Sequence, residues 1–349
     1  MIWSSAPYRF VYHSVRDSFG TLLRSALSGD NSHAVALGPI YELDPGAETL
    51  APFIRSAKES SIDPDLLNDS FLATDWVLQK VQKLRNDNVS SWAGQASDIT
   101  WKDAVHWTRA GLVLEIASRR GIPLNDGKLA HVKWKMRGTV TGRFGVESGG
   151  YNPLLIASEK DRVSGQHALW RSKIVPSAVG REIVAIDFRA MDLSSMISLI
   201  PGLKQHYAGC TDFHERTAEL VGIKRESAKK ELFVHAYGGN SSYSEKFDKH
   251  LPELNWLRQM ANGAGARLVQ QTSATAFRAA LSNALPLLAG EDIKPLFTVH
   301  DELTLDALSR SEDQLALVTK ALEEGASERI GVAYTVGMSK GRNYSEAKL

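Results

Sequence analysis

The first 130 residues carry apolar positions at spacings that predict mostly helices. Apolar residues recur at helical intervals over residues 70–85 and again after Ser97 or Asp98, either of which can serve as an N-cap. The second pattern stops at Gly121-Ile-Pro123, a combination typical of the end of a helix. Residues 1–65 are less regular, and their pattern predicts one strand over 9–15 and two helices over 17–27 and 51–59.

From residue 131 onwards, short apolar runs predict strands that alternate with helices. Glu182–Ile186 is a continuous apolar run of the kind found inside a sheet, and we expect a strand-turn-strand unit, a hairpin and a final strand over 131–144, 297–305 and 332–338. Helical spacing predicts helices over 191–200, 211–221, 225–237, 268–281 and 311–325. Ser311 followed by Gln314 fits a capping box. This order of elements predicts an α+β fold with an antiparallel sheet and helical insertions.

Charge is unevenly distributed along the chain, although all 349 residues together have a formal net charge of only +1. Residues 128–181 hold ten Lys or Arg and three acidic residues, a balance of +7, whereas residues 30–70 hold eight acidic residues and two basic ones, a balance of −6. The net charge gives no reason to expect bulk attraction to nucleic acid or membrane. The local balance predicts that an anionic polymer is attracted to the middle of the chain and repelled from its first part.

Cysteine usage and hydropathy narrow the class of protein. Cys210 is the only cysteine, so no internal disulfide can form, which suits a reducing cytosol. The N-terminal stretch MIWSSAPYRFVYH lacks a basic segment followed by an apolar run, and no apolar run approaches the ~20 residues that span a bilayer. We therefore expect a cytoplasmic protein with neither a signal peptide nor contact with a membrane.

Three short stretches combine residue types that carry chemistry, and the first is IVAIDFRAMDL, residues 183–193. Asp187 lies at the carboxyl end of the apolar strand. Such an aspartate can cap the helix that follows, which for this residue alone is the commoner role. It can also hold a metal ion at the end of a rigid strand.

The second stretch is RESAKKELFVHAYGG, residues 225–239. Arg225, Lys229, Phe233 and Tyr237 recur at four-residue steps and therefore line one face of the expected helix. The two cations can be the solvated edge of an ordinary apolar stripe. Alternatively, they grip a polyphosphate while the aromatic rings stack on the base attached to it.

The third stretch, VHDEL, covers residues 299–303 and interrupts an apolar hairpin. A polar hairpin turn is the commoner interpretation of such a triplet when it is taken alone. Burying charge is costly unless the charge is paired or binds a metal ion. His300, Asp301 and Glu302 can therefore also mark a cation site.

Taken together and in this order, the three stretches match what nucleotidyl transfer requires, because two divalent metal ions need carboxylates from different strands and a nucleoside triphosphate needs nearby cations. The chain resembles the family A DNA polymerases, the bacterial DNA polymerase I and phage replicative group, and the three stretches resemble motifs A, B and C of that family. The resemblance covers roughly residues 131–349. It extends to TVTGRFG, Asp212-Phe-His214, LVQ with Gln270 and the tail VAYTVGMSKGRNY.

The resemblance implies a right-hand polymerase with an antiparallel-sheet palm, helical fingers inserted in it and a reduced helical thumb. Its expected parts are an N-terminal segment of unknown role (1–65), a thumb-like helical region (66–130), the first part of the palm (131–200), the fingers (201–262) and the second part of the palm (263–349).

The resemblance also implies roles for individual residues. Two Mg²⁺ ions, for which Mn²⁺ can substitute, would be held by Asp187 and Asp301. The incoming dNTP would be bound by Arg225, Lys229 and His214 at the triphosphate, with Lys229 also a proton donor to pyrophosphate, and by Phe233 at the base and sugar and Tyr237 near the templating position. The primer–template DNA would be contacted by Arg143, Gln270 and His300. Arg171 lies where the family has another cation near the nucleotide.

Departures from the family pattern carry their own expectations. Asp192 replaces the usual glutamate that excludes a ribose 2′-hydroxyl, so we expect weaker exclusion of ribonucleotides. Phe233 predicts resistance to dideoxynucleotides. The first 130 residues hold no carboxylate set for a 3′–5′ exonuclease, so we expect no proofreading. Residues 1–65 could instead serve as a brace or as a docking surface for a helicase, a primase or a separate exonuclease.

Three other functions share part of this pattern. A phage-type single-subunit RNA polymerase has the same motif order, but position 233 and the His-Asp-Glu of the third stretch argue against it. A non-catalytic accessory protein that binds primer–template usually loses a carboxylate or the lysine, and both are present here. A two-metal nuclease or phosphatase explains the carboxylates but not the helix of cations and aromatics. A compact polymerase without proofreading suits a phage or prophage that acts in DNA replication or repair in the bacterial host cytoplasm.

Overall fold

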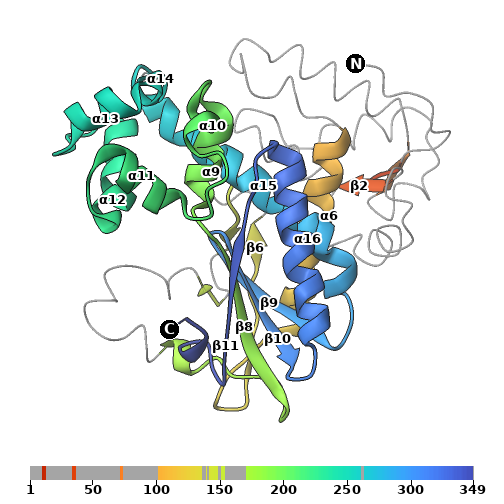
Figure 1. Cartoon of the computed structure of the whole chain (residues 1–349). Coiled ribbons are helices and arrows are strands. Elements are labelled where there is room, and N and C mark those ends of the chain that lie inside the picture. Colours follow the sequence, from red (N-terminus) through yellow and green to blue (C-terminus); the bar gives the residue numbers. More distant parts are fainter. Residues whose placement is uncertain are drawn as a thin grey trace.

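The computed structural model describes residues 10–12, 34–36, 71–73, 101–135, 139, 141–147, 151–153, 170–260 and 263–348. Within them the chain forms a four-stranded sheet, three long helices packed against it, and a lobe of shorter helices (Figure 1). Among these residues, no helix combines the length and the apolar character needed to cross a membrane.

The four-stranded sheet is antiparallel throughout, in the order β11-β8-β10-β9. Its strands are β8 (Arg181–Phe188), β9 (Ile293–Val299), β10 (Glu302–Leu308) and β11 (Val336–Gly341). The apolar run Ile183–Ile186 is fully buried and suits a strand with neighbours on both edges. The register pairs Glu302 with Asp187 at one end of the sheet and Leu308 with Arg181 at the other.

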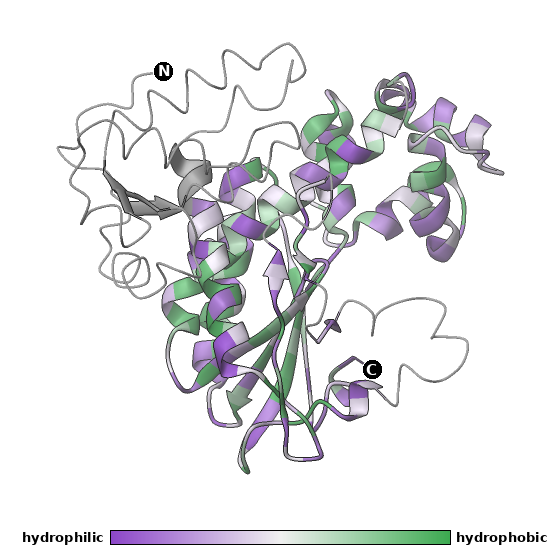
Figure 2. Ribbon diagram, turned by 180° about the vertical axis from the view of Figure 1, so that it is seen from behind, coloured by the Kyte–Doolittle hydropathy of each residue, from purple (hydrophilic) through white to green (hydrophobic). Residues whose placement is uncertain are grey.

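Three long helices cover the sheet: α6 (Trp101–Arg120), α15 (Ala264–Leu288) and α16 (Glu312–Ile330). Apolar side chains from the sheet and these helices form one continuous core, visible as green segments on the strands and the helices in Figure 2. Gly325 brings α16 close to α15, because a Cβ atom at this position would lie 2.6 Å from the carbonyl oxygen of Ala279. The sheet is therefore held against a rigid helical layer.

The lobe of shorter helices follows β8 in the chain and has its own core. Its helices are α9 (Met191–Leu199), α10 (Leu203–His206), α11 (Phe213–Val221), α12 (Arg225–Ala236), α13 (Ser244–His250) and α14 (Asn255–Arg258), with a 3₁₀ turn, η3 (Pro252–Leu254). Buried residues from these helices pack together, among them Leu232, Phe247 and Leu257. The chain then returns through α15, so the lobe is an insertion between two parts of the sheet (Figure 1).

The remaining described elements are short. Two small ribbons pair β4 (Ile122–Pro123) with β5 (Leu129–Ala130) and β6 (Trp134–Lys135) with β7 (Gly145–Val146). A three-stranded sheet is made of β1 (Phe10–Tyr12), β2 (Ala34–Ala36) and β3 (Phe71–Ala73), and a 3₁₀ turn, η5 (Glu346–Lys348), follows β11.

The mixed helix-and-sheet class is confirmed, and most expected elements occur within a few residues of their expected bounds. The helix expected over 70–85 is wrong at its start, because Phe71–Ala73 pairs with β1 as a strand; the rest of that range lies outside the described residues. The helices expected over 17–27 and 51–59 also lie outside them, while β1 confirms a strand within 9–15. A long-range strand pairing has overridden a local helical pattern at Phe71–Ala73.

Two further expectations are corrected. Ser311 is the N-cap of α16, but its side chain makes no capping hydrogen bond, so the capping box is absent. The last strand begins at Val336 rather than at Val332, because the backbone N–H groups of Tyr334 and Val336 donate to the side chains of Ser327 and Glu323 on α16. Contacts with the neighbouring helix thus delay the start of the strand.

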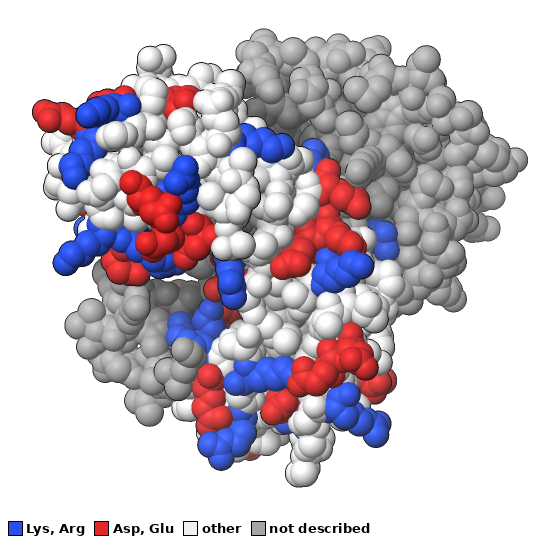
Figure 3. Space-filling view, in the orientation of Figure 1, with Lys and Arg blue, Asp and Glu red and all other residues white. Residues whose placement is uncertain are grey.

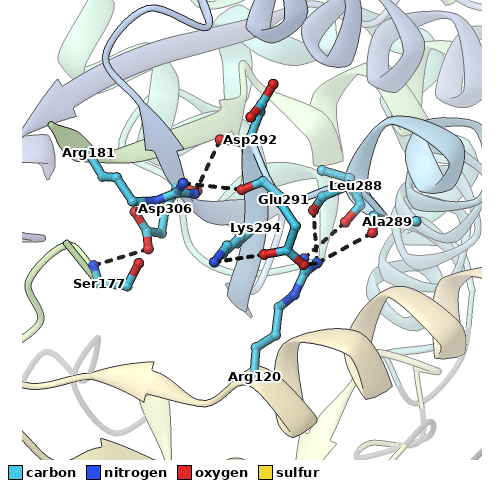
Figure 4. Close-up of polar contacts among 10 residues, drawn as sticks. Arg120, Ser177, Arg181, Leu288, Ala289, Glu291, Asp292, Lys294 and Asp306 are labelled. Carbon is cyan, nitrogen blue, oxygen red and sulfur yellow. Dashed lines mark hydrogen bonds and ion pairs between the residues drawn. The ribbon is translucent and has the colours of Figure 1, made fainter.

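A buried ion pair holds the end of the sheet that lies away from Asp187 (Figure 4). The Arg181 guanidinium donates to the Asp306 carboxylate at 2.8 Å and to the carbonyl oxygens of Asp306, Glu291 and Asp292 at 2.7, 3.1 and 3.2 Å. The second carboxylate oxygen of Asp306 accepts from the Ser177 N–H at 3.1 Å. Because the side chains of Arg181 and Asp306 are only 6% and 0% exposed, this cluster ties β8 to β10 and to the loop before β9.

Candidate active site

Two carboxylates meet at one end of the sheet. Asp187 is the second-last residue of β8, and Asp301 belongs to the two-residue loop that joins β9 to β10. Asp187 lies opposite Glu302 in the strand pairing, and the N–H of Phe188 donates to the carbonyl oxygen of Asp301 at 3.3 Å. The structure therefore brings together the two aspartates that the sequence predicts as metal ligands, from two adjacent strands.

The hairpin loop holds Asp301 in a strained turn. His300 has a φ of 56°, in the left-handed region that favours glycine. A two-residue hairpin turn needs a positive φ at its first position, so the histidine occupies this position at a cost of about 1–2 kcal/mol. Strain of this kind persists where the surrounding structure fixes it, and it commonly marks functional sites.

The negative charge of Asp187 makes ionisation of Asp301 less favourable. Removal from water, followed by repulsion from Asp187, raises the pKa of Asp301 to about 7. A cation placed between the carboxylates would relieve this repulsion. Carboxylate oxygens are hard donors that suit Mg²⁺, which commonly takes one or two protein carboxylates and completes its shell with water and substrate phosphates. The two carboxylates fit such an ion. In the described part of the chain, no three or more His, Cys, Asp or Glu side chains are arranged so that together they could hold a metal ion.

Glu302 is a third carboxylate at this place, and it is buried. One of its oxygens accepts hydrogen bonds from the hydroxyl groups of Thr304 and Tyr344, both at 2.8 Å. The other accepts a hydrogen bond from the ammonium group of Lys348, which also lies 3.5 Å from a carboxylate oxygen of Asp187. Burial lowers the pKa of Lys348, but Glu302 and Asp187 raise it more strongly, and the net shift is upward.

Tyr344 and Lys348 were not predicted as site residues, and Glu302 was considered only as part of the His300-Asp301-Glu302 triplet, with no role of its own. Lys348 lies more than 40 positions from Glu302 along the chain. The contact depends on the turn η5 folding back onto the sheet, for which no local pattern gives a signal.

A second polar group links the start of α9 to α15. Asp192 accepts from Arg143 at 3.2 Å and from the hydroxyl of Ser273 at 2.6 Å. The connection between β8 and α9 is only two residues long and turns at Ala190, whose φ of 53° is also in the left-handed region. This sharp turn places Asp192 within one helical turn of the strand that carries Asp187.

A pocket lies between this group and the hairpin, lined by Arg143, Met191, Ser273, Phe277, His300 and Asp301 among others. Partial desolvation and the nearby Arg143 lower the pKa of His300, against the opposing effect of Asp187 and Asp192. Gln270 lies on α15 three residues before Ser273, and the helical spacing places it toward the same face. Of the residues expected at the primer–template, Arg143 and His300 thus line one pocket with Asp301, and Gln270 lies on the helix that forms one of its walls.

Helix α12 carries the predicted series of cations and aromatics. The rings of Phe233 and Tyr237 lie 5.8 Å apart between centroids, and the ring of His214, on α11, lies 6.3 Å from that of Phe233. The helix ends at Ala236, so Tyr237 is its C-cap residue. Burial, followed by the nearby Asp192 at the start of α9, raises the pKa of Tyr237.

His214 lies near the two cations of α12. The imidazole is buried, and its Nδ1 atom has no hydrogen-bond partner among the described residues. Burial lowers the pKa of His214, and Lys229 and Arg225 lower it further. His214 is therefore neutral at pH 7 while the two cations stand beside it. Lys229 itself is exposed.

Arg225 is already engaged by carboxylates. Its guanidinium lies 2.9 Å from Asp212 and 3.2 Å from Glu226. Asp212 is also the N-cap of α11 and accepts from the N–H groups of His214 and Glu215. Figure 3 shows cationic and acidic side chains next to each other on this helical lobe. An anionic ligand at α12 has to compete with these carboxylates for Arg225.

Arg171 lies apart from the α12 cations. Its guanidinium carbon lies 5.7 Å from the ring centroid of Tyr344, the tyrosine that donates to Glu302. Arg171 is therefore linked to Glu302 through Tyr344.

The fold and the site together define a mixed helix-and-sheet protein in which a carboxylate pair at the end of an antiparallel sheet adjoins a helix of cations and aromatics. No protein-family model matches the sequence. The chain is 27% identical over 218 residues to "DNA polymerase I, thermostable" of Thermus thermophilus. The matched region covers 58% of this chain and 25% of the relative. This similarity confirms the predicted resemblance to the family A DNA polymerases.

The matched region spans only a quarter of the length of that relative. Among solved structures, the chain matches the "POL domain of Pol1 from M. smegmatis complex with DNA primer-template and dNTP" with a TM-score of 0.49 and 16% identity, over 94% of this chain and 70% of that one.

Proposed function

We propose that the chain is a template-directed DNA polymerase that extends a DNA primer with dNTPs by two-metal-ion nucleotidyl transfer. The observation that carries the proposal is that Asp187, near the end of β8, adjoins Asp301 in the β9–β10 loop, in a chain whose helix α12 carries a series of cations and aromatics. The similarity to a DNA polymerase I agrees with it. A carboxylate pair alone would also fit a two-metal nuclease or phosphatase, and a helix of cations and aromatics alone would also fit an ordinary surface helix. A DNA polymerase requires both.

Asp187 and Asp301 would hold Mg²⁺, with Mn²⁺ able to substitute. When bound, these ions supply the Lewis acidity that activates a primer 3′-hydroxyl and neutralises charge at the phosphorus. Asp301 carries a raised pKa in the free protein, so it would lose its residual proton when it takes up a cation. The two aspartates would hold the ions in a fixed place because Asp187 lies on β8 and Asp301 lies in the short loop between two paired strands.

The exposed cations of α12 would bind the triphosphate. Lys229 is free to reach a phosphate and to donate a proton to the departing pyrophosphate, while Arg225 would exchange Asp212 and Glu226 for phosphate oxygens. Neutral His214 can donate a hydrogen bond without adding charge. Phe233 would pack against the base and sugar, and Tyr237 would stack near the templating base. Movement of α12 would complete the site only with the correct nucleotide bound.

The primer–template would lie along the basic middle of the chain. Arg143 and His300 line the pocket beside the carboxylates and, with Gln270 on α15, would contact the DNA end there. Arg171 lies against the ring of Tyr344. From there it would approach the nucleotide from the side of the site that holds Glu302. Residues 131–200 and 263–349 would form the palm, 201–262 the fingers and 66–130 the thumb, with 1–65 a brace or a docking surface for a helicase, primase or exonuclease.

We extend the proposal to the setting of the reaction. Without a proofreading carboxylate set in the first 130 residues, these 349 residues would polymerise DNA without removing 3′-terminal mismatches. This suits phage or prophage replication or repair in a bacterial cytoplasm.

Primer extension tests the proposal. Purified protein, a labelled primer on a longer DNA template and Mg²⁺ are incubated with dNTPs or with rNTPs. Extension to the end of the template with dNTPs, without shortening of a mismatched primer, supports the proposal. Extension with rNTPs alone would indicate an RNA polymerase, and tight primer–template binding without extension would indicate a non-catalytic accessory protein.

Asp192 is expected to set how strongly ribonucleotides are excluded. Its carboxylate is held by Arg143 and Ser273, and a glutamate would extend one methylene further toward the sugar. We predict that Asp192→Glu lowers ribonucleotide incorporation relative to deoxyribonucleotide incorporation by about tenfold, since one methylene is worth about 1–3 kcal/mol of discrimination. The ratio of kcat/KM values for rNTP and dNTP measures it, and an unchanged ratio would contradict the prediction.

Phe233 is expected to govern the use of chain terminators. A tyrosine at this position places a hydroxyl beside the sugar, where it can replace the hydrogen-bonding contact that a missing 3′-hydroxyl leaves open. We predict that Phe233→Tyr raises dideoxynucleotide incorporation by about tenfold or more, as expected for a gained hydrogen bond to a charged ligand. Termination ladders at fixed ratios of dideoxy to deoxy substrate measure this, with normal dNTP extension as the control. Identical ladders would refute it.

A further inference from the structure

The carboxylates of Asp187, Asp301 and Glu302 lie at the same end of the sheet. Asp187 and Asp301 are partly exposed, whereas Glu302 is buried. Glu302 directly follows Asp301 and faces Asp187 across the strand pair. Its side chain is 2% exposed and accepts from Thr304, Tyr344 and Lys348. Both oxygens of Glu302 are therefore occupied by partners from the protein itself.

Lys348 supplies the positive charge in this arrangement. Its ammonium group bonds to the free oxygen of Glu302 and lies 3.5 Å from Asp187. The formal charge of the three carboxylates and one ammonium is −2, where the carboxylates alone would carry −3. Lys348 thus neutralises one carboxylate and leaves the charge of two.

The turn that carries Lys348 is anchored independently of the lysine. Ala347 is fully buried, and its carbonyl oxygen accepts from the hydroxyl of Ser339 on β11. Glu346 accepts from the backbone and side chain of Arg342 at 2.9 and 3.2 Å. Removal of the ammonium group is therefore expected to leave the turn in place and to change the charge balance at the carboxylates.

We propose that Lys348 is a positioning residue that keeps Glu302 out of the cation site, so that cations are bound by Asp187 and Asp301 alone. The proposal rests on the proposed function, because it assigns the carboxylate pair to metal ions. Without the lysine, Glu302 is a buried unpaired charge, and an unpaired buried charge must recruit another cation or take up a proton. By recruiting the cation held by the two aspartates, Glu302 becomes an additional ligand beside Asp187.

Binding of Mn²⁺ to the free protein tests this proposal without reference to catalysis. Bound and free Mn²⁺ are separated by electron paramagnetic resonance in wild type and in Lys348→Met. We expect Lys348→Met to bind Mn²⁺ at least about fivefold more tightly, because one ligand and one negative charge are added to the site. Lys348→Arg keeps the charge and is expected to bind like wild type.

Two further variants separate positioning from simple anchoring of the chain end. The double variant Lys348→Met with Glu302→Gln removes the released carboxylate, and its Mn²⁺ affinity is expected to return to the wild-type value. Lys340→Met removes an ammonium group on β11 that pairs with Glu312 at the start of α16, and is expected to leave Mn²⁺ affinity unchanged. Thermal unfolding of each variant checks that it is folded.

The outcomes are distinct. Equal or weaker Mn²⁺ binding in folded Lys348→Met overturns the proposal, even if wild type extends primers. If wild type binds no Mn²⁺ and extends no primer, the proposed function itself fails. In primer extension, Lys348→Met is expected to reach half-maximal activity at a lower Mg²⁺ concentration, with a reduced kcat and little change in the KM for dNTP.

Discussion

Asp301→Asn is expected to reduce primer extension by about 10³-fold or more, since a metal ion supplies several kcal/mol of charge stabilisation in the transition state and each 1.36 kcal/mol is a factor of ten in rate. An amide is isosteric with the carboxylate but cannot replace its charge. Single-turnover extension of one nucleotide, measured over a range of Mg²⁺ concentrations, gives the rate. Asp126→Asn, which changes an exposed turn carboxylate, is the matched control and is expected to extend primers normally.

Stability measurements separate this loss of activity from unfolding. The folded-state pKa of Asp301, about 7, lies above the ordinary value of 3.8, so the folded protein holds the proton more tightly than the unfolded chain does. Without divalent metal, Asp301 therefore lowers the free energy of unfolding as pH rises from about 4 to about 7. The free energy of unfolding of Asp301→Asn, compared with that of wild type, should therefore increase as the pH rises across this range. A variant that is inactive and less stable at pH 8 would contradict the prediction.

Arg181→Met is expected to lower the free energy of unfolding by about 3–5 kcal/mol, the usual effect of removing one partner of a buried ion pair. The change leaves Asp306 buried without its cation and removes hydrogen bonds to the carbonyl oxygens of Glu291 and Asp292 (Figure 4). Urea denaturation at pH 7 measures the loss from the midpoint and the slope.

Lys320→Met provides the comparison for the loss of a cation. Lys320 pairs with Glu324 on the exposed face of α16, where the two side chains are 69% and 51% exposed, and its removal should cost about 0.5 kcal/mol or less. Arg181 lies six residues along β8 from Asp187, roughly 20 Å in a strand, so folded Arg181→Met should retain wild-type Mn²⁺ binding. A loss below 1 kcal/mol would show that the cluster is not a stabilising one.

The parts of the site that could be predicted from the sequence are those built by short segments. The strand with Asp187 follows from a continuous apolar run, the hairpin with Asp301 from apolar residues on both sides of a polar triplet, and the face of α12 from four-residue spacing. The pairing of β8 with β10, which brings the two aspartates together, joins segments more than 100 residues apart, and it was expected only through the resemblance to a polymerase family.

The parts that could not be predicted depend on contacts between distant segments. Glu302, Tyr344 and Lys348 meet only after β11 has paired with β8 and η5 has folded back. The same cause explains the strand at Phe71–Ala73 and the late start of β11, where a distant partner decides the conformation. Arg225 illustrates a different limit, since its pairing with Asp212 depends on how two helices of the lobe pack.

The two-residue loop between β9 and β10 has a consequence for how this protein can change in evolution or in the laboratory. Side chains alternate between the two faces of a strand, so one residue added to the loop would turn Asp301 or all of β10 to the opposite face. The same slip would move Asp306 away from Arg181 at the far end. Insertions and deletions are therefore excluded at His300-Asp301, and variation of the chemistry there has to proceed by substitution alone.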